Sequence, residues 1–136
     1  MKNAQINWLA VLAVVVISQV IPAIWYGLFA KTWMAGNNMT EAQAMSAAVP
    51  MNYLIAALYA LVAAYLMLLL MDKMGINTAI EGAKLGLLLG GLAFGGMMLC
   101  NIFSIRPFNL TLIDGGNNVA IFTAAGAILG GWQKKT

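Results

Sequence analysis

The sequence predicts an all-α fold, an integral membrane bundle of four transmembrane helices, and three observations lead to this prediction. Hydrophobic residues make up 62% of the 136 positions and charged residues only 8%, whereas a soluble domain carries about 25% charged residues. Four apolar runs are long enough to cross a hydrocarbon core, which takes about 20 residues. Helix-capping patterns stand between these runs. So little polar surface cannot cover a water-soluble globule, and we expect lipid to be the main solvent.

The whole chain, residues 1–136, is expected to form a single transmembrane domain. The predicted spans cover residues 6–30, 50–71, 79–105 and 110–132. The first run is too long for the apolar region of a secretory signal, and no small-x-small cleavage site closes it. We therefore expect it to be a permanent span.

Capping patterns mark the boundaries of the predicted helices. Thr78 and Glu81 have the spacing of a capping box at the start of the third span, in which a Thr side chain and a Glu three residues later satisfy free amides. Thr40 and Gln43 repeat the pattern, and predict a short helix or an early start of the second span. Gly75 is a plausible stop for the second span, so a tight helical hairpin is expected at 72–78.

The distribution of basic residues predicts the orientation. With four spans, both termini and the hairpin share one face, which holds Lys2, Lys73, Lys84, Lys134 and Lys135. The opposite face holds Lys31 and Arg106. Basic residues concentrate on the cytoplasmic side, so both termini are predicted to be cytoplasmic. Trp33, Trp25 and Tyr26 are expected to be anchors at the outer interface.

Glycines recur at four-residue spacing in the third and fourth spans. The glycines predicted to pack helices are Gly82, Gly86, Gly90, Gly91, Gly95, Gly126 and Gly130. Small residues at this spacing let two helix backbones approach closely. The partner is either another helix of the same bundle or a second copy of the chain, and we expect the protein to self-associate.

Polar residues inside the spans gather in the predicted outer half. Asp114, Asn117 and Asn118 stand at i, i+3 and i+4, so they share one helix face. The other candidate ligand- or ion-binding residues are Gln19, Tyr26, Asn101 and Arg106. An ionisable residue in a span costs free energy and often marks a functional site. Asn and Gln also hold membrane helices together, and Arg106 or Lys31 would neutralise Asp114, so a structural role is the competing interpretation.

Composition excludes several kinds of chemistry. The chain has one cysteine, Cys100, and no histidine, so no disulfide forms within it and a metal or haem site is not expected. The usual proton shuttle is also missing. We expect no cofactor and no enzymatic activity. No basic patch with interleaved aromatic residues occurs, so no nucleic-acid partner is expected.

The opening stretch INWLAVLAVVVISQVIPAIWYGLFAKTWM, residues 6–34, has a distinctive pattern. Its elements are Asn7, Trp25, Tyr26, Gly27, Leu28, Phe29, Lys31 and Trp33. This pattern resembles the opening of a bacterial membrane family, domain of unknown function 1761 (DUF1761). The stretches NIFSIRPFNLTLIDGG (101–116) and GAILGGW (126–132) resemble later parts of the same family. The resemblance implies a small four-span protein of the bacterial inner membrane, and it brings no activity with it.

Two functions remain open from the sequence. The first is an uncharacterised structural or accessory membrane protein whose polar residues serve assembly. The alternative is a small transporter or channel-like protein that uses the polar cluster around Asp114. Small multidrug transporters also have four spans, but they rely on a glutamate in the first one, where this chain has Gln19 and no carboxylate. The sequence favours the first function, because nothing identifies a substrate.

Overall fold

The computed structural model describes residues 6–133 and contains only helices within that range. These are α1 (Trp8–Gly36), α2 (Glu41–Ser46), α3 (Pro50–Met74), α4 (Ala79–Phe103) and α5 (Phe108–Gly131). All except the short α2 are long and apolar enough to cross a membrane. The predicted all-α fold with four spans is confirmed.

The helix ends follow the capping patterns of the sequence. Thr40 and Gln43 form a complete capping box at α2, so the short helix is present. The Thr78 side chain accepts a hydrogen bond from the backbone N–H of Glu81 at the start of α4. Gly75 ends α3 with φ 69°, in the left-handed region that glycine adopts without strain. The first span is longer than predicted, because α1 continues past Ala30 to Gly36.

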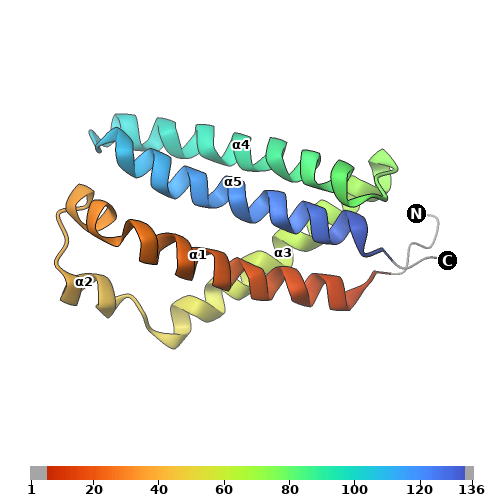
Figure 1. The fold of residues 1–136 in the computed structure, drawn as a ribbon, viewed down its shortest axis with the longest axis horizontal. Helices are drawn as coiled ribbons and strands as arrows, with labels where there is room; N and C mark the ends of the chain where they lie inside the picture. The colour runs from red at the N-terminus through yellow and green to blue at the C-terminus, as the bar shows by residue number, and fades with distance from the viewer. Residues whose placement is uncertain (1–5, 134–136) are drawn as a thin grey trace.

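Three of the spans form a layer, and α3 crosses it obliquely (Figure 1). In this layer α5 lies between α4 and α1, and it also contacts α3. The described ends of the chain meet, because the Asn7 side chain donates to the Trp132 carbonyl at 2.8 Å. Gln133 donates to the carbonyl of Ile76 at 2.7 Å. These two bonds bring the ends of the described chain to the same side as the α3–α4 hairpin.

The core lies in the half of the molecule nearer to this hairpin. Its buried residues are Ala10, Val11, Val14, Ala64, Met67, Met71, Leu85, Ala125 and Leu129. All the buried residues of α3 lie between Ala60 and Met71. The preceding part of α3, from Pro50 to Tyr59, buries no side chain. This part of the helix therefore diverges from the layer and leaves space beside α1 and α5.

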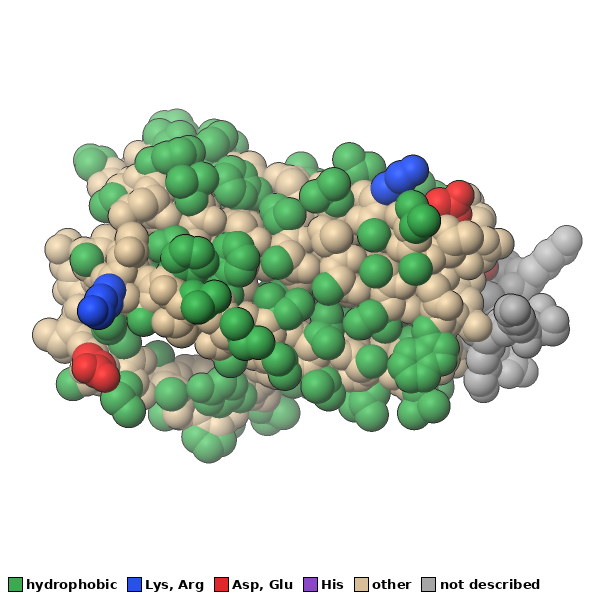
Figure 2. Space-filling model, in the orientation of Figure 1, with side chains coloured by type: hydrophobic (Ala, Val, Ile, Leu, Met, Phe, Trp, Pro, Cys, Tyr) green, Lys and Arg blue, Asp and Glu red, His purple; other side chains and the backbone are tan. Residues whose placement is uncertain are grey.

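Apolar side chains cover the middle of the surface in Figure 2, and the charged side chains visible on that face lie toward the two ends. Leu28, Leu88 and Leu92 are each at least 70% exposed. A soluble monomer rarely exposes apolar surface on this scale. The surface is that of a multi-pass membrane protein with lipid around its middle.

The tightest contact in the fold joins the backbones of α4 and α5. A β-carbon at Gly82 would overlap the carbonyl oxygen of Gly126, and one at Gly86 would overlap that of Phe122. At Gly90 it would lie 2.7 Å from Cα of Val119. Gly130 meets the backbone of Thr78 in the same way. Only glycine allows these two helices to lie so close.

Two of the glycines that the sequence groups with this contact lie elsewhere. A β-carbon at Gly91 or Gly95 would have no atom within 4 Å. Both therefore face away from the α4–α5 contact within the chain.

This difference predicts opposite effects of one substitution at two places on α4. Gly91→Ala should stabilise the protein slightly, by about 0.5–1 kcal/mol, because alanine has the better helix propensity and open space is available. Gly86→Ala should destabilise it by about 1–3 kcal/mol, because its methyl group meets the backbone of α5. Unfolding in detergent titrated with dodecyl sulfate measures both. Equal effects at the two positions would contradict the packing described.

Candidate functional site

The carboxylate of Asp114 is bonded to α1. Its Oδ1 atom accepts a hydrogen bond from the Tyr26 hydroxyl at 2.7 Å and another from the Trp33 indole N–H at 3.0 Å. Tyr26 and Trp33 are seven residues apart on α1, so both lie on one helix face. Their rings also contact each other edge to face, with centroids 5.5 Å apart. We call this arrangement of Tyr26, Trp33 and Asp114 the aspartate clamp.

A second bond between α1 and α5 reinforces the clamp at the neighbouring residues Trp25 and Ile113. The Trp25 indole N–H donates to the carbonyl of Ile113 at 2.8 Å. The edge of the Trp25 ring lies against Gly116, where a β-carbon would come within 2.9 Å of it. Both side chains are directed at α5, whereas the sequence suggested only that Trp25 and Tyr26 serve as interfacial anchors or ligand contacts. Three donors of α1, in Trp25, Tyr26 and Trp33, therefore bind the first half of α5.

The remaining candidates at this end of the molecule do not join the clamp. Asn101, on α4, is 7% exposed and donates to the Thr111 hydroxyl at 3.0 Å. Arg106 is exposed in the connection between α4 and α5. The partners of Asp114 are thus neutral aromatic donors, rather than the cations Arg106 or Lys31 that the sequence suggested.

Three further candidates lie nearer the middle of the spans. Asn117 is 6% exposed, and its Oδ1 atom has no hydrogen-bond partner within residues 6–133. The same holds for the Nε2 atom of Gln19 on α1. Asn118 instead lines a cavity. The residues on the predicted polar face of α5 therefore have separate surroundings: Asp114 is bonded to α1, whereas Asn117 and Asn118 lie apart from the clamp.

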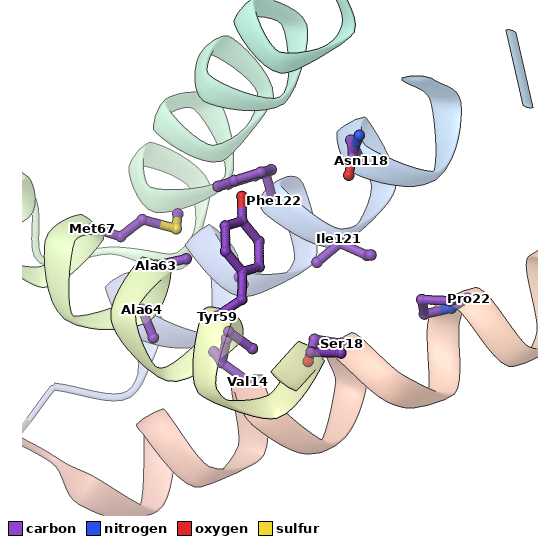
Figure 3. Close-up of a pocket in the computed structure, with 13 residues that line it drawn as sticks. Val14, Ser18, Pro22, Tyr59, Ala63, Ala64, Met67, Asn118, Ile121 and Phe122 are labelled. Carbon is purple, nitrogen blue, oxygen red and sulfur yellow. The ribbon is translucent and has the colours of Figure 1, made fainter. Parts of the chain in front are cut away.

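The cavity has a volume of about 200 Å³ and lies between α1, α3 and α5. Figure 3 shows Ser18 and Pro22 of α1 on one side, with Asn118 and Ile121 of α5 facing them. Tyr59 of α3 lies beside Ile121, with its hydroxyl toward Phe122. The cavity exists because the first part of α3 diverges from the layer.

Two hydrogen-bond partners, Trp33 and Thr111, were not predicted in these roles from the sequence. Trp33 was expected at the interface and not as a donor to Asp114, although its seven-residue separation from Tyr26 placed the two on one face. Thr111, the hydrogen-bond partner of Asn101, was not considered. Within the described range, no group of three or more metal-ligating side chains occurs. The geometry therefore offers hydrogen bonding and apolar contact.

Comparison with known proteins identifies a family and nothing more specific. A family model described as "Protein of unknown function (DUF1761)" matches residues 9–130, nearly the whole chain. No curated protein and no solved structure matches.

The aspartate clamp predicts a graded loss of stability on mutation of Asp114. Asp114→Ala leaves the Tyr26 hydroxyl and the Trp33 N–H without an acceptor, and should lower the free energy of unfolding by about 3 kcal/mol. Asp114→Asn keeps an oxygen at this position and should cost only about 1 kcal/mol. Asp72→Ala, at an exposed aspartate near the end of α3, is the control. Dodecyl sulfate unfolding ranks the variants, and equal losses at the two aspartates would contradict the clamp.

Proposed function

Since the chain belongs to the DUF1761 family of proteins of unknown function, we infer its function from its own structure and propose a structural or accessory membrane protein without enzymatic activity. In this proposal the polar residues of its spans hold the helices in one arrangement. Lipid surrounds the molecule, and a second copy of the chain is its expected partner. The outward face of α4, where Gly91 and Gly95 have open space, is available to lipid or to a second copy of the chain.

The hydrogen bonds that Asp114 accepts from α1 are the observation that carries this proposal. Asp114 is the only acidic residue in the interior of a span. A carboxylate that binds or couples an ion must exchange partners during the cycle. Here one oxygen already accepts two hydrogen bonds from α1, at 2.7 and 3.0 Å. The arrangement supports a carboxylate that fixes α1 against α5, which is the role the structural hypothesis requires.

The proposal includes a place and an orientation in the cell. We place the protein in the bacterial cytoplasmic membrane with both termini in the cytoplasm. The excess of lysines at that end supports the orientation, although Lys2, Lys134 and Lys135 lie outside the described residues. Lys73 and Lys84 lie near the α3–α4 hairpin, and Lys31 and Arg106 belong to the opposite end.

Ion flux through reconstituted protein tests the structural role. Liposomes that contain the protein and a trapped pH-sensitive dye should dissipate a proton or potassium gradient no faster than protein-free liposomes. The Asp114→Asn variant should behave identically, since it keeps the acceptor oxygen and the fold. Flux through the native protein that disappears in Asp114→Asn would overturn the proposal in favour of ion coupling.

Single-cysteine labelling tests the orientation. In a Cys100→Ala background, Ser46→Cys introduces an exposed thiol on α2, and Asn77→Cys introduces one in the α3–α4 hairpin. A membrane-impermeant maleimide added to spheroplasts should label only Ser46→Cys, and both variants after lysis. Labelling of Asn77→Cys alone in intact spheroplasts would reverse the orientation.

A further inference from the structure

The cavity between α1, α3 and α5 lies near the middle of the spans, where polar groups are most costly. Pro22 stands at the middle of α1, and Asn118 lies close to the middle of α5. Both line the cavity. Unbonded polar groups in hydrocarbon carry a large free-energy penalty, so the polar atoms at this depth need partners.

Two of the polar side chains that line the cavity lack such partners. The Asn118 amide and the Tyr59 hydroxyl make no hydrogen bond to any group in residues 6–133. Figure 3 shows the Tyr59 hydroxyl close to Phe122, and Asn118 on α5 across from Pro22 of α1. An amide offers both donors and an acceptor, and a phenol offers one donor and an acceptor. The cavity therefore has free hydrogen-bonding capacity on two of its three helices.

Residues next to this lining show the same deficit. Asn117 follows Ile113 by one turn and precedes Asn118, and its Oδ1 atom is buried without a partner in the described chain. Gln19 follows Ser18, and its Nε2 atom is likewise buried and unpaired there. α1 and α5 thus each bury one amide atom without a partner in the described chain, next in sequence to a residue that lines the cavity.

The α1 wall of the cavity is rich in acceptors. The Ser18 hydroxyl donates to the carbonyl of Val15 at 2.7 Å, which leaves its oxygen free to accept. Proline has no N–H, so Pro22 deprives the Ser18 carbonyl of its usual helical donor. Together with the Asn118 carbonyl oxygen, these atoms favour a ligand that brings an N–H or O–H donor.

The size, charge and remaining lining of the cavity restrict the ligand further. A volume of about 200 Å³ is slightly larger than the roughly 150 Å³ of an apolar cavity that holds benzene. No lining side chain carries a formal charge, and the rest are apolar, among them Ile121, Phe122 and Met67. A charged ligand would lose its hydration without compensation. Tyr59 is 64% exposed, so the cavity borders the lipid from which an apolar molecule can enter.

We propose that the cavity between α1, α3 and α5 binds an uncharged amphiphile of one or two rings, with its N–H or O–H group among Ser18, Tyr59 and Asn118. The ring body lies against Ile121, Phe122 and Pro22. This site is independent of the aspartate clamp, and it does not require transport. The structural role does not account for this cavity, and the proposal assigns it a class of ligand.

Binding of a fluorinated probe to the full chain in lipid nanodiscs tests the site. The probe is 5-fluoroindole, which has a ring N–H, and 5-fluoroindene has the same shape without that donor. Fluorine NMR titration, corrected with empty nanodiscs for partition into lipid, gives the dissociation constant of each. We expect saturable binding of 5-fluoroindole that is about five- to tenfold tighter than binding of 5-fluoroindene, the usual effect of one hydrogen bond.

Two variants and two matched controls assign the binding to this cavity. Asn118→Leu should weaken 5-fluoroindole binding about five- to tenfold, whereas Asn109→Leu, the same change at an exposed position of α5, should leave it within about twofold. Ala63→Leu fills the cavity and should abolish binding of both probes. Ala23→Leu, at an exposed position of α1, is its control.

The unfolding midpoint of each variant shows whether it is folded. If Ala63→Leu fails to fold, Asn118→Leu alone decides whether the ligand hydrogen-bonds in the cavity. Equal affinity for the two probes, with no effect of Asn118→Leu, would show an apolar slot of the kind that a lipid acyl chain fills, and would overturn the proposal. Absence of saturable binding of either probe would also overturn it. Loss in Ala63→Leu together with selective weakening in Asn118→Leu would support it.

Discussion

The backbone contact between α4 and α5 is the constraint on which the other helices depend. In lipid, burial of apolar side chains gives little drive to helix association, so close van der Waals contact and hydrogen bonds must supply it. Gly82, Gly86 and Gly126 provide the close contact, since no β-carbon separates the two backbones. This contact fixes which face of α5 remains for α1. On that face lie Gly116, which receives the Trp25 ring, and Asp114, which receives two hydrogen bonds.

The four spans are consequently held by different means. The layer of α4, α5 and α1 combines close backbone contact with polar bonds between helices. The buried side chains of α3 are apolar, Ala60, Ala64, Met67 and Met71. Small and flexible side chains of this kind pack against a crossing helix, but they do not fix its direction over its full length. This difference explains why a cavity forms beside α3 and not between α4 and α5.

The sequence predicted the features that depend on local chemistry. Apolar length located the spans, and cap residues such as Thr40 and Gly75 located their ends, because both effects act within a few residues of the chain. Glycine spacing indicated a close helix contact, but it did not distinguish Gly86 from Gly91. These two glycines lie five residues apart, and the face that meets α5 depends on how the whole helix is rotated. Such a rotation is a property of the packed molecule.

The candidate site was harder to predict for the same reason. Asp114 drew attention because a carboxylate is rare in a span, and the expected neutralising partner was a cation. Trp33 and Tyr26 satisfy it instead, since α1 is longer than hydropathy indicated and carries Trp33 to the level of Asp114. The cavity depends on the angle between α3 and the layer, to which no short motif corresponds. Asn118 was included in the candidate residues, but its separation from Asp114 was not foreseen.

The length of α1 has a consequence for the response of the molecule to its membrane. At 1.5 Å per residue its apolar part, from Trp8 to Ala30, extends about 35 Å, a few ångströms beyond a hydrocarbon core of about 30 Å. Such hydrophobic mismatch is relieved by tilt. Because α1 is bonded to α5, and α5 is packed on α4, these three helices must tilt as one body. Bilayer thickness therefore acts mainly on the angle between this body and α3, and that angle sets the width of the cavity.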